Sequence, residues 1–523
     1  MKKFLTITLL LLTTCSGFLL SQVRFSTDFD SGSIGNFKLI DSVWVKRNAS
    51  DSILTLSYLI ESRFDPLNPV DTTLKPSARW YHFRMEGVKD KQIFLNIKNS
   101  EVIRPIYSYD GINYQRFKDV ENIYKGSVNK IFERDTVYIS HFIPYPYSRH
   151  KAKLLEWKEK PGVKHDTIGH STLGLPIEML TVTDPLVPDN EKKRIWIHGR
   201  SHPSETPASW HLEAMIDQIL SESPLAKELR RNAIFYLIPF INPDGVKGGF
   251  SRSSSTGVNI EINWDRPDSL TMPEVKTLKA ALERVTKEKP LDLLLNMHSQ
   301  ISSSVTYWIH TAESTTADFL KEQQLLSALT INYTPFYRPQ DQSFSAMAPR
   351  YAEGWVWDRF GEKTLAITFE TPYTYYNQDK DGPWVSTTNL AELGYSSLLS
   401  VSDFLNLDKA NRILIDANEI KFSHRNWDVS DNPSNIFFGD SYLIAKKEGA
   451  QIKYKTHLKE GVYTLYSWKV GPTEKTYPDD TNKWVKKATV IQRRDGNFSY
   501  KIKSSNSGEK MDAILLVKES IPK

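Results

Sequence analysis

Between residues 146 and 408, short apolar runs alternate with segments of helical spacing. The runs are "RIWIHG", "AIFYLIPF", "DLLLNMH" and "TLAITFE", and each has the composition of a buried strand. Strands that alternate with helices in this way are typical of an α/β domain. We therefore predict a mixed, largely parallel sheet with helices on both faces.

The segments on either side of this domain are rich in β-branched and aromatic residues, with turn residues between the runs. Residues 22–145 are predicted to form an N-terminal β-sandwich and residues 409–523 a C-terminal β domain. We expect the C-terminal domain to be an autonomous sandwich that attaches the chain to a surface, a glycan or its substrate. Trp468 and Trp484 could stack on sugars there if they are exposed, although tryptophan more commonly packs in a core.

Residues 1–21 begin with Lys2 and Lys3 and continue as a short apolar run, which is the pattern of a secretory signal peptide. The residues after the run are too polar for a transmembrane span. The chain is therefore expected to be exported, as a periplasmic or secreted protein. Its only cysteine, Cys15, lies inside this leader. A lipid anchor on Cys15 is the alternative, but no small residue precedes it.

Composition limits the classes of partner. The chain has 40% hydrophobic and 25% charged residues, as folded globular proteins do. Loss of the two leader lysines would lower its formal net charge from +5 to about +3. So small a charge does not indicate a nucleic-acid partner.

Four residues suited to metal or acid–base chemistry follow the predicted strands. His202 and Glu205 come after "RIWIHGR", His298 ends "DLLLNMH" and Glu370 ends "TLAITFE". In open α/β sheets, sites form at the carboxyl ends of the strands, so we expect the four to converge. Two imidazoles and one carboxylate are a known ligand set of catalytic zinc, which keeps a fourth position for water. Taken alone, a His-x-x-Glu pair such as His202 and Glu205 occurs often by chance, so it does not by itself indicate a metal site. His298 alone could equally be a core histidine.

A helix is predicted to begin just after Glu205. Thr206 offers an N-cap hydroxyl and Pro207 suits the first helical position. His202 and Glu205 would then lie between a strand end and a helix start.

Four sequence motifs follow one another along the chain in this order: "HGRSHPSETPAS", "IPFINPDGV", "NMHSQ" and "ITFETPY". Together they resemble the zinc carboxypeptidase family, the carboxypeptidase A-like metallopeptidases, over roughly residues 146 to 405. "ARWYHFRMEGV" and "FIPYPYS" are similar to the cytosolic-carboxypeptidase branch, in which a β-sandwich precedes the peptidase domain. The resemblance implies a carboxypeptidase-like fold.

The resemblance also implies a role for each matched residue. His202, Glu205 and His298 would hold one zinc ion, and Glu370 would be the general base that takes a proton from a zinc-activated water. Arg252 matches the arginine that stabilises the oxyanion, although it could also be a surface arginine.

One part of the family pattern is altered. The family usually reads Gly-Val-Asp-Leu-Asn-Arg-Asn-Trp, in which the Asn-Arg pair grips the terminal carboxylate of the substrate. This chain has Glu261 and Ile262 in place of that pair, followed by Asn263 as in the family. Loss of the arginine and gain of an acid should disfavour a free carboxylate and favour a neutral or cationic end group.

A relocated clamp is the alternative to this expectation. Arg266, Arg338 and Arg350 lie near enough in the sequence to supply it. Tyr351 is a candidate for the substrate-facing tyrosine of the family, and it could equally be a packing residue.

We interpret the chain as an exported zinc metallopeptidase of the metallocarboxypeptidase kind, which acts on a peptide or peptide conjugate. A cell-wall peptide amidase or a deacylase on the same scaffold is one alternative. A catalytically silent binding protein is another, but such relatives usually lose a ligand or the base, and all four residues are present here.

Overall fold

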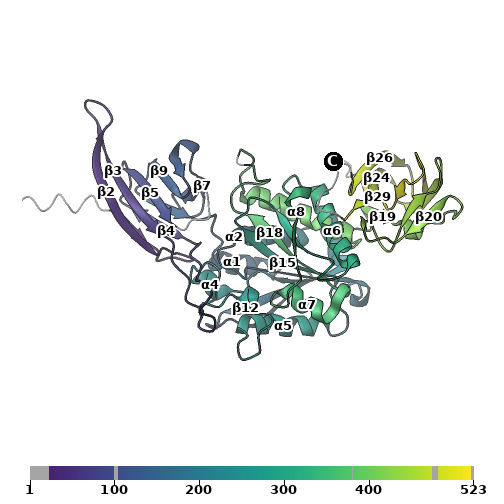
Figure 1. Ribbon diagram of the computed structural model, residues 1–523, viewed down its shortest axis with the longest axis horizontal. Helices are drawn as coiled ribbons and strands as arrows, with labels where there is room; N and C mark the ends of the chain where they lie inside the picture. Colours follow the sequence, from purple (N-terminus) through teal and green to yellow (C-terminus); the bar gives the residue numbers. More distant parts are fainter. Residues whose placement is uncertain (1–22, 99–103, 380, 474–480, 520–523) are drawn as a thin grey trace, which may run out of the picture. The chain divides into compact units, whose positions relative to one another are not determined.

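The computed structural model describes residues 23–98, 104–379, 381–473 and 481–519 (Figure 1). The predicted signal peptide and Cys15 lie outside these residues. Within them, no helix has the length and apolar character needed to cross a membrane. The described residues divide into two compact units, of which the first comprises those up to Asp65 with Ser77–Pro144 and Gly248–Ser251, and the second is the remainder.

The first unit contains two β-sheets that share one apolar core. The first sheet is β1 (Arg24–Ser26), β4 (His82–Glu86), β10 (Thr136–Ser140), β6 (Ile106–Ser108) and β7 (Gln115–Arg116). The second is β2 (Asn36–Lys46), β3 (Ser52–Glu61), β5 (Gln92–Lys98), β9 (Ser127–Ile131) and β8 (Asn122–Tyr124). Leu56, Tyr58 and Ile60 of β3 alternate with less buried residues and face Phe83 and Ile139 of the other sheet in that core. The pairings are antiparallel except that of β3 with β5.

The second unit is built on an eight-stranded mixed sheet. In spatial order the strands are β11 (Val163–His170), β12 (Pro176–Val182), β14 (Ala233–Ile238), β13 (Lys193–Gly199), β15 (Leu293–Gln300), β18 (Leu365–Pro372), β16 (Thr306–His310) and β17 (Ser343–Ser345). The four central strands, β14, β13, β15 and β18, are mutually parallel. Every residue of β14 is buried, as expected for a strand covered on both faces.

Helices cover both faces of this sheet, which confirms the predicted fold class. They are α1 (Tyr147–Trp157), α2 (Thr206–Ile219), α3 (Pro224–Asn232), α4 (Pro243–Lys247), α5 (Pro273–Thr286), α6 (Ala317–Tyr333), α7 (Ala352–Phe360) and α8 (Thr387–Phe404). Figure 1 shows α2, α6 and α8 on one side of the sheet and α5 and α7 on the other. Trp196 and Leu294 of the sheet pack with Leu278 of α5 and Trp355 of α7 in one core cluster.

The start of α2 differs from the prediction by one residue. Glu205 is the N-cap, Thr206 is the first helical residue and Pro207 the second. The Glu205 carboxylate makes no capping hydrogen bond, because both of its oxygens contact histidines. The hydroxyl of Ser299 instead accepts a hydrogen bond from the N–H of Ala208 at 2.9 Å.

The C-terminal part consists of small β-sheets around an apolar core. Its strands are β19 (Arg412–Ile415), β29 (Ile514–Lys518), β24 (Gly461–Lys469) and β26 (Lys483–Gln492) in one sheet, β20 (Trp427–Ser430), β22 (Tyr442–Ala445) and β28 (Lys510–Met511) in a second, and the pairs β21 (Asn435–Ile436) with β25 (Gly471–Pro472) and β23 (Gln451–Leu458) with β27 (Gly496–Lys503).

This C-terminal part shares an apolar cluster with the peptidase domain. Leu325 and Leu329 of α6 pack with Phe438 and Trp468 in the same buried cluster. The shared cluster is a physical reason against the expectation that the C-terminal part is autonomous. Of the two alternatives for Trp468, the structure shows core packing: the side chain is 2% exposed, and its indole donates a hydrogen bond to the carbonyl of Ile436. Trp484 is half-buried against it.

We expect Trp468→Ala to destabilise the second unit by about 3 to 5 kcal/mol, because it leaves a cavity in the shared cluster. Ile491→Ala is the matched control, since Ile491 is 70% exposed, and it should change the stability by less than about 0.5 kcal/mol. Urea unfolding followed by circular dichroism measures both. Equal stability of the two variants would show that Trp468 does not support the contact with α6.

Candidate metal centre and active site

The candidate site lies at the carboxyl ends of three adjacent parallel strands. His202 and Glu205 occupy the turn between β13 and α2, His298 lies in β15, and Glu370 lies in β18 directly opposite His298 in the strand register. The structure therefore brings together the four residues that the strand ends predicted.

The turn that carries His202 and Glu205 is held by a buried arginine. Arg200 has a positive φ of 65°. Its guanidinium donates hydrogen bonds to the carbonyls of Pro203 and Tyr145 and to the hydroxyl of Ser209. Three hydrogen bonds from one rigid side chain fix the path of the turn.

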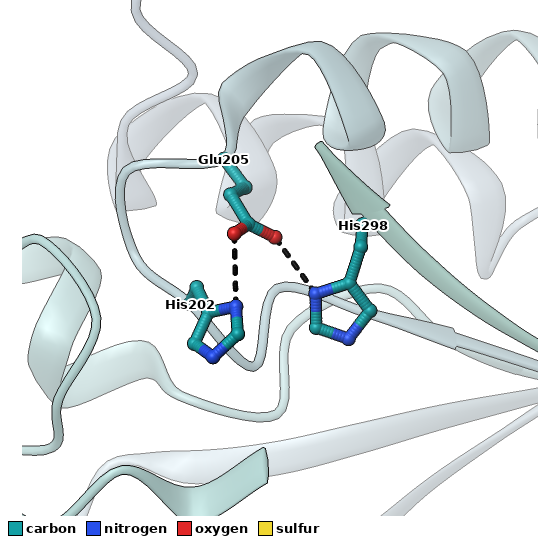
Figure 2. Close-up of side chains that lie close together, drawn as sticks. All are labelled: His202, Glu205 and His298. Atoms are coloured by element: carbon teal, nitrogen blue, oxygen red, sulfur yellow. Dashed lines mark hydrogen bonds and ion pairs between the residues drawn. The ribbon is translucent and has the colours of Figure 1, made fainter. Parts of the chain in front are cut away.

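The ligating atoms of His202, Glu205 and His298 all lie within 4.8 Å of one another (Figure 2). Oε1 of Glu205 is 2.8 Å from Nδ1 of His202, and Oε2 is 2.8 Å from Nδ1 of His298. All three side chains are buried. Two imidazole nitrogens and one carboxylate that converge in this way fit the donor set of a catalytic zinc ion.

The ionisable groups of this cluster shift one another's pKa values. Burial lowers the pKa of His202 to about 4, and the charge of Arg252 adds to this effect. Burial alone would raise the pKa of Glu205, but the two histidines hold it well below its usual value. Burial likewise lowers the pKa of His298, but the carboxylates of Glu261 and Glu205 outweigh it and raise the pKa well above the usual value. A carboxylate kept ionised in a buried site is ready to bind a cation.

Glu370 has the environment of a general base. Burial and the neighbouring Glu205 carboxylate raise its pKa to about 7. The indole of Trp308 donates a hydrogen bond to Oε1 at 3.3 Å. Oε2 is buried and has no hydrogen-bond partner among the described residues. One oxygen is thus oriented while the other remains able to accept a proton.

Arg252 lies beside the metal ligands. Its Nη1 is 3.3 Å from Oε1 of Glu205, and its side chain is 36% exposed. The guanidinium therefore lies between the buried cluster and solvent, where a substrate oxygen could reach it.

The predicted substrate-binding residues do not form one surface. Glu261 is buried, with Oε1 accepting a hydrogen bond from Asn296 and Oε2 only 3.2 Å from Nε2 of His298. The acid expected to face the end group of the substrate is therefore directed at a zinc ligand. Asn263 is buried and bonds to the backbone of Leu270 and Met272.

Ile262 and Asn263 both border an opening, and Ile262 is the less buried of the two. They line a cavity of about 70 Å³ together with Asn259 and Arg266. Tyr351 lies elsewhere, at the N-cap of α7, where its hydroxyl accepts a hydrogen bond from Arg350.

The three arginines considered as a relocated clamp differ in their surroundings. Arg338 forms a bidentate ion pair with Asp341, and Arg350 stacks on the ring of Tyr351. Arg266 alone of the three lines the cavity that Ile262 borders.

The polar residues behind the site were not among the predicted site residues. Asn296 donates hydrogen bonds to Glu261 at 2.8 Å and to Glu353 at 3.0 Å, and the hydroxyl of Thr368 also donates to Glu353. Burial, and then the charge of Glu261, raise the pKa of Glu353. The signal for Asn296 was present, because it is a polar residue inside an apolar strand, two positions before His298 and on the same face. Glu353 and Trp308 carried no such signal.

The fold and the donor set together define a zinc-dependent metallohydrolase. A model of the zinc carboxypeptidase family matches residues 152–395. The matched residues belong to the zinc carboxypeptidase family, which confirms the resemblance, and the cluster of His202, Glu205 and His298 fits the single zinc site of that family.

Individual relatives agree with this assignment. Cytosolic carboxypeptidase 6 of Mus musculus is 27% identical over 315 residues, which are 55% of this chain and 52% of that protein. The chain spans about half the length of the curated relatives it matches. The metallo-carboxypeptidase structure from Burkholderia cenocepacia is 21% identical, with a TM-score of 0.60 over 74% of this chain and 99% of that one, and so shares the fold. A metallo-carboxypeptidase structure from Pseudomonas aeruginosa is 22% identical, with a TM-score of 0.59 over 74% and 100%.

Metal analysis of the purified chain should find one zinc ion per molecule. His298→Ala should lose most of it at equal protein concentration, because two donors hold zinc far less tightly than three. His424→Ala changes an exposed histidine and serves as the control. Full zinc occupancy in His298→Ala would place the metal elsewhere.

Proposed function

We propose that the chain is a zinc metallocarboxypeptidase that hydrolyses an amide bond of a peptide or peptide conjugate. The observation that carries the proposal is the convergence of His202, Glu205 and His298 within 4.8 Å, next to a carboxylate in the register position opposite His298. A binding-only scaffold has no need of that combination.

The residues around the metal position divide the chemistry between them. Zinc, when bound by the three ligands, supplies a Lewis acid that polarises the scissile carbonyl and acidifies a water molecule. Oε2 of Glu370 accepts the proton of that water and later gives it to the leaving amine. Trp308 holds the other oxygen of Glu370, so that the basic oxygen keeps its direction.

Arg252 is proposed to bind the carbonyl oxygen of the substrate as negative charge develops on it. Its guanidinium carries a delocalised positive charge and is partly exposed beside Glu205. A fixed positive charge at this position lowers the barrier, because it interacts more strongly with the oxyanion than with the neutral carbonyl.

The end group of the substrate meets an apolar side chain where the family pattern has an arginine. Ile262 offers no charge to a terminal carboxylate, and Glu261 directs its charge at His298. We propose that the enzyme accepts peptides whose end group is neutral or cationic, as in an amidated or branched peptide.

Export of the chain is proposed from residues 1–21 alone, which carry the signal-peptide pattern. Cell fractionation, with amino-terminal sequencing of the mature protein, tests it. Recovery of the intact chain from the cytoplasm would contradict export without affecting the proposed chemistry.

Glu370→Gln should lower kcat by about 10²- to 10⁴-fold, because the amide cannot accept the proton. Zinc content should not change, since Glu370 is not a ligand in the proposed site. Glu448→Gln, at an exposed position, is the control. Turnover at the wild-type rate in Glu370→Gln, with the metal in place, would rule out this mechanism.

Paired peptides that differ only in a free or an amidated carboxyl end should be cleaved with kcat/KM values within about tenfold of each other. A charge-assisted clamp is worth about 1.5 to 3 kcal/mol, which exceeds tenfold. A strong preference for the free acid would contradict the proposal. In that case Arg266→Gln should abolish the preference and Arg350→Gln should not, because only Arg266 lines the cavity with Ile262.

A further inference from the structure

The two zinc-site histidines differ in what their outer nitrogens contact. Each ring turns Nδ1 toward Glu205 (Figure 2). Nε2 of His202 is 3.1 Å from the amide oxygen of Asn259, whereas Nε2 of His298 is 3.2 Å from a carboxylate oxygen of Glu261. One histidine thus has an amide oxygen behind it and the other a carboxylate oxygen.

A single short turn places both acceptors. Asn259 is the N-cap of a 3₁₀ turn, Ile260–Ile262, and its side-chain oxygen accepts a hydrogen bond from the N–H of Glu261 at 3.0 Å. Asn259 and Glu261 are therefore linked by a hydrogen bond within the same turn. The family pattern has an aspartate at the first of these positions and an asparagine at the second, so the carboxylate of this segment lies two residues later here and behind the other histidine.

The Glu261 carboxylate is buried, and its contacts leave it no role at a solvent-facing surface. The side chain is 7% exposed. Asn296 holds Oε1 at 2.8 Å. Oε2 of Glu261 and Nε2 of His298 lie 3.2 Å apart, and neither atom makes a hydrogen bond of good geometry among the described residues. Asn296 is itself anchored by its second hydrogen bond, to Glu353 at 3.0 Å.

We propose that Glu261 is a positioning residue for His298, which keeps the proton on Nε2, leaves Nδ1 free to bind zinc, and raises the affinity of the site for the metal. This inference rests on the proposed zinc-dependent function. An ionised acceptor makes the opposite nitrogen of an imidazole a stronger donor to a metal than a neutral acceptor does. It also fixes the ring plane, so that less ordering is needed when the metal binds.

Zinc affinity tests the inference without a substrate. The metal-free protein is prepared with a chelator, and its zinc dissociation constant is measured by competition with a fluorescent chelator. Glu261→Gln should weaken zinc binding by about 10- to 100-fold, the usual effect of removing such a partner. Glu353→Gln is the matched control, because it changes the next carboxylate of the same network, which does not contact a ligand.

A double variant separates charge from shape. Glu261→Asn should weaken zinc binding, and Asn259→Asp combined with it should recover most of the loss, because a carboxylate then stands behind His202. The visible spectrum of the cobalt-substituted protein should change in Glu261→Gln and not in Glu353→Gln. Thermal unfolding of the metal-free variants shows whether each one is folded.

Two results would decide against the inference. Zinc affinity within twofold of wild type in Glu261→Gln, with an unchanged cobalt spectrum, would overturn it. So would unchanged zinc affinity together with an altered KM for peptides, since that would assign Glu261 to the substrate. Failure of the wild-type chain to bind zinc would instead refute the proposed function.

Discussion

The carboxylate of Glu205 is the interaction on which the site depends. It bridges His202, three residues away in the same turn, and His298, 93 residues further along the chain. It also accepts a hydrogen bond from the N–H of Ser299 at 3.1 Å. One buried side chain thereby joins a local turn to the centre of the sheet. Such a bridge can form only because β13 and β15 are adjacent and parallel, so that their carboxyl ends meet.

The fold could be predicted because local patterns determine it, whereas the metal ligands were assigned through the four ordered motifs that resemble the zinc carboxypeptidase family. Apolar runs such as "AIFYLIPF" specify buried strands wherever they occur, and their alternation with helices restricts the sheet to a mostly parallel arrangement. Polar residues at the carboxyl ends of these parallel strands then lie at the same edge of the sheet. The helix start was wrong by one residue, because the identity of the N-cap depended on where the Glu205 carboxylate pointed.

The remaining features depend on contacts between distant segments, which a local pattern does not contain. The position of Glu261 in the altered motif was evident, but its direction is set by a 3₁₀ turn and by Asn296 on another strand. Glu353 belongs to the site only because α7 packs against β15 and β18. A tryptophan such as Trp468 can either bind a sugar at the surface or pack in a core. Its burial here depends on α6, which lies more than a hundred residues earlier in the sequence.

The apolar cluster on α6 limits how this architecture can be rearranged. A helix that covers a catalytic sheet normally presents charged residues on its outer face, but α6 presents Leu325 and Leu329 to a neighbouring set of strands. The C-terminal strands are therefore not a domain that could be exchanged for another without changing α6. A different appendage grafted after α8 would need a matching hydrophobic surface, or α6 would need a new polar face. Recombination at this boundary is thus constrained by packing, although the catalytic residues lie on the opposite side of the junction in sequence.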